Sequence, residues 1–132
     1  MVAGGAVIAL GVGFSARCTA AELEALAAGV LRAVPGDRGP RRIATLERKR
    51  ETGLLEAVAE RLDLTPLYLS AEDLAPFQEG LSRSAPAEAA VGLTAVAEAA
   101  ALAAAAPGAR LVVAKTASPR ATCAAAIGQG AG

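Results

Sequence analysis

The chain contains no histidine and no tryptophan, and aromatic residues make up only 2% of its 132 residues. Without histidine it lacks the side chain that most often acts as a general base near neutral pH, and imidazole ligation of a metal is impossible. Nucleophilic catalysis of the serine–histidine type is excluded for the same reason. The scarcity of aromatic rings also removes the stacking surfaces on which single-stranded nucleic acid binds.

The chain also lacks an excess of charge of either sign. It has 13 basic and 13 acidic residues and a formal net charge of +0, so we expect no nucleic-acid partner. Its two cysteines, Cys18 and Cys123, are far apart in the sequence and match no metal-binding spacing. We therefore expect no metal site, and two small buried hydrophobic residues in a reduced, cytoplasmic protein.

Membrane and export signals are weak. Residues 1–20 include an apolar run but no positive region before it, unlike a secretory signal peptide. Residues 85–106 are apolar, yet Pro86, Glu88 and Glu98 interrupt them, which favours a buried helix over a membrane span. The sequence therefore predicts a protein that has no membrane partner.

Alanine is the most abundant residue and makes up roughly a quarter of the chain. Hydrophobic residues total 54%, and the mean hydropathy of +0.43 reflects these small side chains. Small side chains let a helix lie close to a sheet, although each buries little area. The length predicts one domain over residues 1–132, with a flexible tail at 128–132.

The first 34 residues predict a strand, a turn and a helix. The apolar run at 6–10 predicts a buried strand, and Gly11-Val-Gly13 predicts a tight turn in which a ligand can approach bare N–H groups. A helix is expected over 20–34, and its start would add a partial positive charge. Thr19 and Glu22 form a capping box, in which the threonine accepts from the Glu22 N–H and Glu22 reaches back.

The rest of the chain continues this alternation. Strands are expected over 42–46, 67–69, 110–115 and 121–127, and helices over 54–62, briefly from 71 until Pro76 interrupts, and over 93–105. The order predicts the α/β class, as a three-layer α/β/α sandwich around a mainly parallel five-stranded sheet. The turn at 116–120 is short enough for an antiparallel C-terminal hairpin. Ligands of such sheets bind outside the carboxyl ends of the strands.

Five stretches in order resemble the CobE / CbiG C-terminal domain family of cobalamin (vitamin B12) biosynthesis. They are Gly11-Val-Gly13 with Thr19-Ala-Ala-Glu-Leu, Lys49 and Glu51 with Gly53-Leu-Leu-Glu, Tyr68-Leu-Ser70-Ala-Glu-Asp-Leu, Gly92 to Leu102, and Leu111 to Lys115. The resemblance covers nearly the whole chain and implies a compact α/β domain whose ligands are corrin-pathway tetrapyrroles with several carboxylates. Stand-alone relatives belong to the aerobic branch, whereas longer two-domain relatives look like hydrolases that open a lactone on a cobalt-precorrin.

One departure from the family pattern falls in the first loop. Relatives usually carry a cysteine and arginines just after the second glycine, whereas this chain reads Phe14-Ser15-Ala16-Arg17 and has its cysteine at Cys18. The loop keeps one arginine. Because the cysteine is displaced to position 18, a role for a cysteine in this turn does not carry over from the family.

The candidate ligand-binding residues combine these patterns with the resemblance. They are Gly11, Gly13, Phe14, Ser15, Arg17, Lys49, Gly53, Ser70 and Lys115. On the residues alone, plainer interpretations stay open: the glycines make a turn, residues 47–53 are a solvated charge run, and Ser70 caps a helix with Asp73. Lys115 and Arg120 flank the last hairpin as polar strand ends, and the resemblance favours Lys115 as a carboxylate partner.

Three functions remain open. The first is binding of a precorrin or corrinoid intermediate as a carrier or accessory factor, without a cofactor, with pathway enzymes or a second copy of the chain as further partners. The second is a small hydrolase or isomerase with Glu51 or Glu98 as acid or base, although Glu98 could instead face solvent or cap the Gly11 turn. The third is a generic anion- or nucleotide-binding module, against which the missing third glycine and the missing P-loop lysine argue.

Overall fold

A computed structural model describes residues 7–15, 17–34, 41–47, 52–82, 93–106 and 108–128. The elements are β1 (Val7–Phe14), α1 (Ala20–Ala33), β2 (Arg41–Leu46), α2 (Leu54–Leu62), β3 (Thr65–Leu69), α3 (Ala71–Ser82), α4 (Leu93–Ala105), β4 (Arg110–Ser118) and β5 (Ala121–Gly128). The predicted alternation of strands and helices is confirmed. Among the described helices, none is long and apolar enough to cross a membrane.

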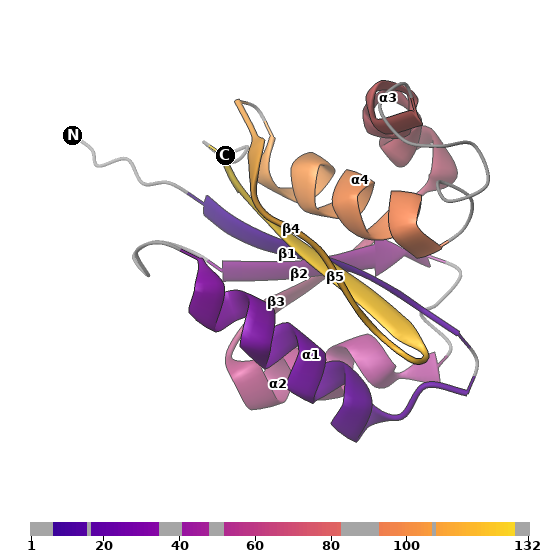
Figure 1. The fold of residues 1–132 in the computed structure, drawn as a ribbon, viewed down its shortest axis with the longest axis vertical. Coiled ribbons are helices and arrows are strands. Elements are labelled where there is room, and N and C mark those ends of the chain that lie inside the picture. Colours follow the sequence, from indigo (N-terminus) through magenta and orange to yellow (C-terminus); the bar gives the residue numbers. More distant parts are fainter. Residues whose placement is uncertain are drawn as a thin grey trace.

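The strands form one sheet in the order β3-β2-β1-β5-β4. The β1–β2 and β2–β3 pairs are parallel, whereas β5 is antiparallel to both of its neighbours, so β5 alone runs in the opposite direction. Helices α1 and α2 lie on one face of the sheet and α3 and α4 on the other (Figure 1). The predicted three-layer sandwich and the antiparallel C-terminal hairpin are therefore confirmed.

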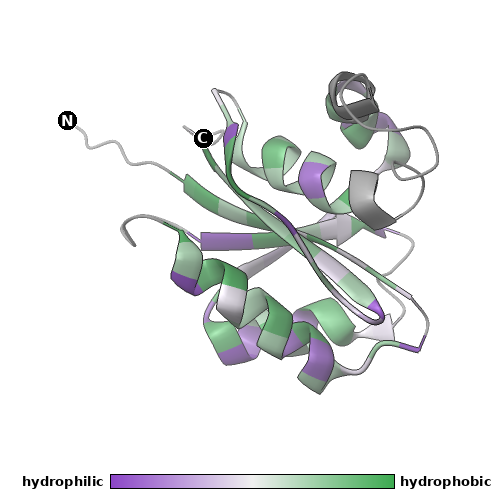
Figure 2. Ribbon diagram, in the orientation of Figure 1, coloured by the Kyte–Doolittle hydropathy of each residue, from purple (hydrophilic) through white to green (hydrophobic). Residues whose placement is uncertain are grey.

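The two faces of the sheet carry side chains of different size, because successive residues of a strand point to opposite faces. Leu10 and Phe14 of β1 belong to a hydrophobic cluster that includes Leu23 of α1 and Val58 of α2. Ala9 belongs to the opposite cluster, which α4 fills almost entirely with alanine. Figure 2 shows hydrophobic residues along the central strands and hydrophilic residues at the tip of the β4–β5 hairpin.

Helix α4 lies directly on the backbone of the sheet. A Cβ atom at Gly11 would overlap the carbonyl oxygen of Ala97, and one at Gly128 would overlap the carbonyl oxygen of Ala105. Arg42 of β2 also donates from Nη1 to the Ala104 carbonyl oxygen at 2.9 Å, near the C-terminus of the helix. The abundance of alanine and glycine therefore has a steric explanation, since only small residues fit between this helix and the sheet.

The predicted turn at Gly11 and Gly13 is wrong. Strand β1 continues through both glycines to Phe14, and Gly11 pairs with β2 on one side and β5 on the other. A central strand has a hydrogen-bonding neighbour on each side, so its ladder continues past residues that locally favour a turn. Gly11 is required for the contact with α4 instead.

Other boundaries also differ from the prediction. Helix α3 continues through Pro76, where one backbone hydrogen bond is lost while buried Leu74 and half-buried Phe77 hold the helix to the α4 cluster. Strand β3 begins at Thr65 and includes Pro66, which an edge strand tolerates. Gly128, predicted to be in the tail, pairs with Val7 in the sheet, and residues 129–132 lie outside the described part.

Candidate functional site

The carboxyl ends of β1, β2 and β3 meet at one edge of the sheet. The strands are parallel and in register there, with Gly11 opposite Ala44 and Leu46 opposite Leu69. Helices α1, α2 and α3 begin at this edge because each follows one of these strands in the chain. Four of the predicted ligand-binding residues are brought to this edge by the fold: Ser15, Arg17, Gly53 and Ser70.

The loop between β1 and α1 is anchored through its backbone. The Ser15 N–H donates to the Arg120 carbonyl oxygen at 3.0 Å, and the Ser15 carbonyl oxygen accepts from the Cys18 N–H at 3.1 Å. Thr19 begins the helix as predicted, since its hydroxyl oxygen accepts from the Glu22 N–H at 3.1 Å. These bonds fix the loop while the side chain of Arg17 remains exposed.

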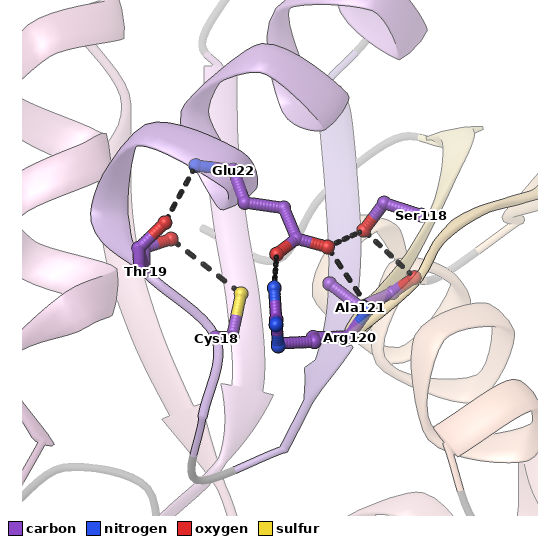
Figure 3. A network of polar contacts seen from close by, with 6 residues as sticks. All are labelled: Cys18, Thr19, Glu22, Ser118, Arg120 and Ala121. Carbon is purple, nitrogen blue, oxygen red and sulfur yellow. Dashed lines mark hydrogen bonds and ion pairs between the residues drawn. The ribbon is translucent and has the colours of Figure 1, made fainter.

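The carboxylate of Glu22 does not complete the capping box, so that half of the prediction is wrong. It is directed instead at the tip of the β4–β5 hairpin (Figure 3). One oxygen accepts from the Ser118 hydroxyl at 2.6 Å and from the Arg120 N–H at 2.9 Å, and the other accepts from Arg120 Nη1 at 3.3 Å. The hydrogen bond from Ser118, followed by that from the Arg120 backbone, lowers the pKa of Glu22 below its ordinary value.

Gly53 and Ser70 each mark the start of a helix. Gly53 has φ 71°, a left-handed conformation that favours glycine, and a Cβ there would meet no atom within 4 Å. Ser70 caps α3 as predicted: its hydroxyl oxygen accepts from the Asp73 N–H, and the Asp73 carboxylate accepts from the Ser70 N–H, both at 3.0 Å. The Ser70 hydroxyl keeps its own hydrogen for a further partner.

Other predicted ligand-binding residues lie elsewhere. Gly11, Gly13 and Phe14 are buried within β1, and Phe14 is fully enclosed in the α1-facing cluster. Their burial removes the exposed N–H groups on which the predicted role of the two glycines rested. Lys49 and Glu51 lie outside the described residues.

Glu98 and Lys115 are brought together by the fold. The backbone N–H of Lys115 donates to the carboxylate of Glu98 at 3.3 Å, which joins α4 to the edge strand β4. Glu98 is half-buried and the Lys115 side chain is exposed. Of the roles considered for Glu98, capping of a Gly11 turn is wrong, because Gly11 lies inside β1.

The two cysteines are buried free thiols. Burial raises the pKa of the Cys18 thiol, with a further contribution from the neighbouring Glu22 carboxylate. Burial also raises the pKa of Cys123 to about 12. Neither thiol is poised as a nucleophile, and the described residues contain no group of three or more acidic or cysteine side chains that could hold a metal ion.

A family model described as "Cobalamin synthesis G C-terminus" matches residues 8–126, from the start of β1 into β5. The chain belongs to this family. No curated protein matches the chain. The predicted resemblance is thereby confirmed, and the chain is a protein of cobalamin biosynthesis.

Three solved structures have a similar fold. CobE, a protein from the cobalamin biosynthetic pathway, is 25% identical with a TM-score of 0.75, and the match covers 100% of this chain and 98% of CobE. The cobalamin biosynthesis protein chiG from Agrobacterium tumefaciens is 26% identical with a TM-score of 0.66, over 92% of this chain and 98% of that one.

The third structure is a cobalamin biosynthesis protein G homolog from Sulfolobus solfataricus. It is 21% identical with a TM-score of 0.64, so it supports the fold alone. The match covers 94% of this chain but only 37% of that longer protein. The fold of this chain therefore corresponds to one part of the longer protein.

Proposed function

We propose that this protein binds a precorrin intermediate of the aerobic cobalamin pathway at the carboxyl edge of its sheet and serves as a carrier or accessory factor. The observation that supports the proposal is the convergence of Ser15, Arg17, Gly53 and Ser70 at that edge, in a member of a cobalamin biosynthesis family. These residues come from three separate β–α connections, so a ligand as wide as a macrocycle could contact them together.

The chemistry of the edge suits carboxylates. Arg17 offers an exposed guanidinium, and charge-assisted hydrogen bonds from arginine to a carboxylate are among the stronger polar contacts. The hydroxyls of Ser15 and Ser70 supply neutral donors, and Gly53 begins α2, whose N-terminus carries a partial positive charge. Lys49 and Lys115 stay predictions as further carboxylate partners, because Lys49 lies outside the described residues and Lys115 lies within the edge strand β4, beside Glu98.

The proposal is tested by titrating the protein with corrin-pathway intermediates and following the absorption spectrum of the macrocycle. A saturable shift, with the compound recovered unchanged after the protein is denatured, supports a carrier. No shift at protein concentrations well above micromolar contradicts the proposal. Thermal stabilisation by nucleotides but not by corrinoids would favour the generic anion-binding module instead.

Arg17→Ala is the single variant that most directly tests the proposed carboxylate contact. Loss of a hydrogen bond between charged groups is expected to weaken binding roughly tenfold or more. Arg32→Ala is the matched control, because Arg32 is also exposed but lies in the last turn of α1, away from the edge. Equal binding by both variants would remove Arg17 from the site.

The enzyme alternative has its own outcome in the same titration. A spectral shift that develops into a new product spectrum would indicate a hydrolase or isomerase. Glu51→Gln and Glu98→Gln then decide whether either carboxylate is the acid or base, since glutamine keeps the size and removes the proton exchange. Turnover that survives both substitutions contradicts that mechanism.

A carrier also needs partners. We propose that the protein is cytoplasmic and exchanges its precorrin with other enzymes of the corrin pathway, and that a second copy of the chain is a further candidate partner. Direct exchange predicts that transfer to the next enzyme becomes faster as the concentration of that enzyme rises, whereas release into solution gives a rate independent of it.

A further inference from the structure

Arg120 lies at the tip of the β4–β5 hairpin, in contact with the loop that carries Ser15 and Arg17. Its carbonyl oxygen accepts from the Ser15 N–H at 3.0 Å, and its own N–H donates to the Glu22 carboxylate at 2.9 Å. Both main-chain groups of Arg120 are therefore bonded. These two bonds fix this turn residue relative to the first loop and to the start of α1, at the carboxyl edge of the sheet.

The side chain of Arg120 has spare hydrogen-bonding capacity. A guanidinium carries five N–H donors in a planar fork, and Nη1 is the group that donates to Glu22, at 3.3 Å. The side chain remains 50% exposed while it makes this contact. An arginine held on one side of its fork can still bind a carboxylate through donors on another side.

Glu22 differs from an ordinary surface partner of arginine. Its side chain is only 16% exposed and accepts three hydrogen bonds from Ser118 and Arg120. The ion pair between Glu24 of α1 and Arg61 of α2 consists of one contact at 2.9 Å, and the two side chains are 32% and 59% exposed. An exposed pair of that kind contributes little, whereas the Glu22 contacts include the backbone of the hairpin and so determine where its tip lies.

We infer that Arg120 is a further carboxylate-binding residue of the corrinoid site, and that Glu22 is the positioning residue that holds it there. This inference rests on the proposed function. Arg17 and Arg120 are both close to Ser15, because Arg17 follows it two residues later in the chain and the Arg120 carbonyl oxygen accepts from its N–H. Two cations on this loop and hairpin suit a macrocycle whose side chains end in several carboxylates. Even with Glu22 ionised, Arg17, Arg120 and Glu22 together carry a net positive charge.

Two corrin probes that differ in their side chains test the inference. Cobyrinic acid presents free carboxylates, whereas cobinamide presents amides. Arg120→Ala is expected to weaken binding of cobyrinic acid roughly tenfold or more and to leave cobinamide within about twofold of the native protein. Arg120→Lys keeps the charge without the planar fork, so we expect it to restore part of the affinity.

Glu22 is tested through its coupling to Arg120. Glu22→Ala is expected to reduce the preference for cobyrinic acid over cobinamide, and Glu22→Gln, which keeps the size and the acceptor oxygen, to reduce it less. The double variant Glu22→Ala with Arg120→Ala should have the same preference for cobyrinic acid over cobinamide as Arg120→Ala alone. A positioning residue acts only through the group that it positions, so its loss has no further effect once that group is absent. Glu24→Ala and Arg61→Ala are the controls, and they should leave the preference unchanged.

The outcomes separate the inference from the proposed function. If the native protein prefers cobyrinic acid and Arg120→Ala retains that preference, the inference is overturned and the proposed function stands. If Arg120→Ala weakens both probes equally and lowers the melting temperature, the pair is only structural and the inference is again overturned. If the native protein binds neither these probes nor any corrin-pathway intermediate, the proposed function fails as well.

Discussion

Gly11 of β1 and Ala97 of α4 are in backbone-to-backbone contact, because a Cβ atom at Gly11 would overlap the carbonyl oxygen of Ala97. Main-chain atoms of the helix therefore set its distance from the sheet. A second contact of the same kind, between Gly128 and Ala105, sets the distance near the other end of the helix. At these two positions the helix and the sheet meet through backbone atoms, with no side chain between them.

Gly11→Ala should be strongly destabilising for this reason. The added methyl group would have to displace backbone rather than the end of a flexible side chain, and overpacking of this kind typically lowers the free energy of unfolding by about 1–3 kcal/mol, occasionally more. Urea denaturation followed by circular dichroism measures the change. A Gly11→Ala protein as stable as the native one would contradict the close approach of α4.

Gly29→Ala is the matched control for that substitution. Gly29 lies in the interior of α1, and a Cβ there would meet no atom within 4 Å. Alanine is favoured over glycine inside a helix by roughly 0.5–1 kcal/mol, so this variant should be more stable than the native protein. The two substitutions have the same chemistry and opposite expected signs, which separates the steric effect at Gly11 from the general effect of removing a glycine.

Thr45 provides a test of the contact between β2 and β1. It is fully buried, and its hydroxyl donates to the Val12 carbonyl oxygen at 2.7 Å. Thr45→Val keeps the shape and removes the donor, so we expect the free energy of unfolding to fall by about 1–2 kcal/mol. Thr45→Ser, which keeps the hydroxyl, should retain this hydrogen bond and lose only the contacts of one methyl group. If the valine variant matched the native protein, the bond would have no net stabilising effect.

The stability of the protein should depend on pH through Glu22. Since the folded protein lowers the pKa of Glu22, chiefly through the Ser118 hydroxyl, its contribution is complete above the ordinary glutamate range. That contribution is lost as the pH falls through the lowered pKa. The difference in melting temperature between the native protein and Glu22→Gln should therefore be largest near pH 7 and shrink below about pH 4.

Glu24→Gln serves as the control for the pH experiment. Its ion pair with Arg61 is exposed, so the substitution should change the melting temperature little at either pH. A difference between native protein and Glu22→Gln that stayed constant down to acidic pH would show that the carboxylate charge is not what holds the hairpin.

The buried thiols should react only when the protein opens. Burial raises the pKa of Cys123 to about 12, and its side chain is fully enclosed. Thiolate is the reactive form, so alkylation of Cys123 in native buffer should be slow and should accelerate sharply in urea. Mass spectrometry of the alkylated peptides measures both cysteines separately. Rapid native labelling of Cys123 would contradict its place in the core.

Much of the fold could be predicted from local patterns. The apolar run and the Pro107-Gly108 that follows it correctly predict the helix at Leu93–Ala105, and Asp73, three residues after Ser70, correctly predicts that Ser70 caps α3. Alternation of strands and helices was enough to predict a three-layer sandwich. These features succeed because the interactions that determine them lie within a few residues along the chain.

The errors share a different physical origin. Gly11 and Gly13 locally favour a turn, but the contact that requires Gly11 comes from α4, far away in the sequence. Glu22 fits a capping box, but a Ser118 hydroxyl and an Arg120 N–H compete for the same carboxylate and are satisfied together. No local pattern reveals such partners. Only the structure shows that the β4–β5 hairpin is bonded to the first loop and to the start of α1 at the candidate site.

Strand β5 lies between β1 and β4, although it follows every other described element in the chain. While the protein is being synthesised, β1 therefore has an unpaired edge from Val7 to Phe14 until this strand emerges. Every helix that the structure describes precedes β5 in the chain, so these helices are synthesised before β5 emerges. β5 can pair with β1 along its whole length only after residue 128 has left the exit tunnel. A chain that terminates early therefore leaves this edge of β1 unpaired, and an unpaired edge of an apolar strand promotes aggregation or binding by chaperones.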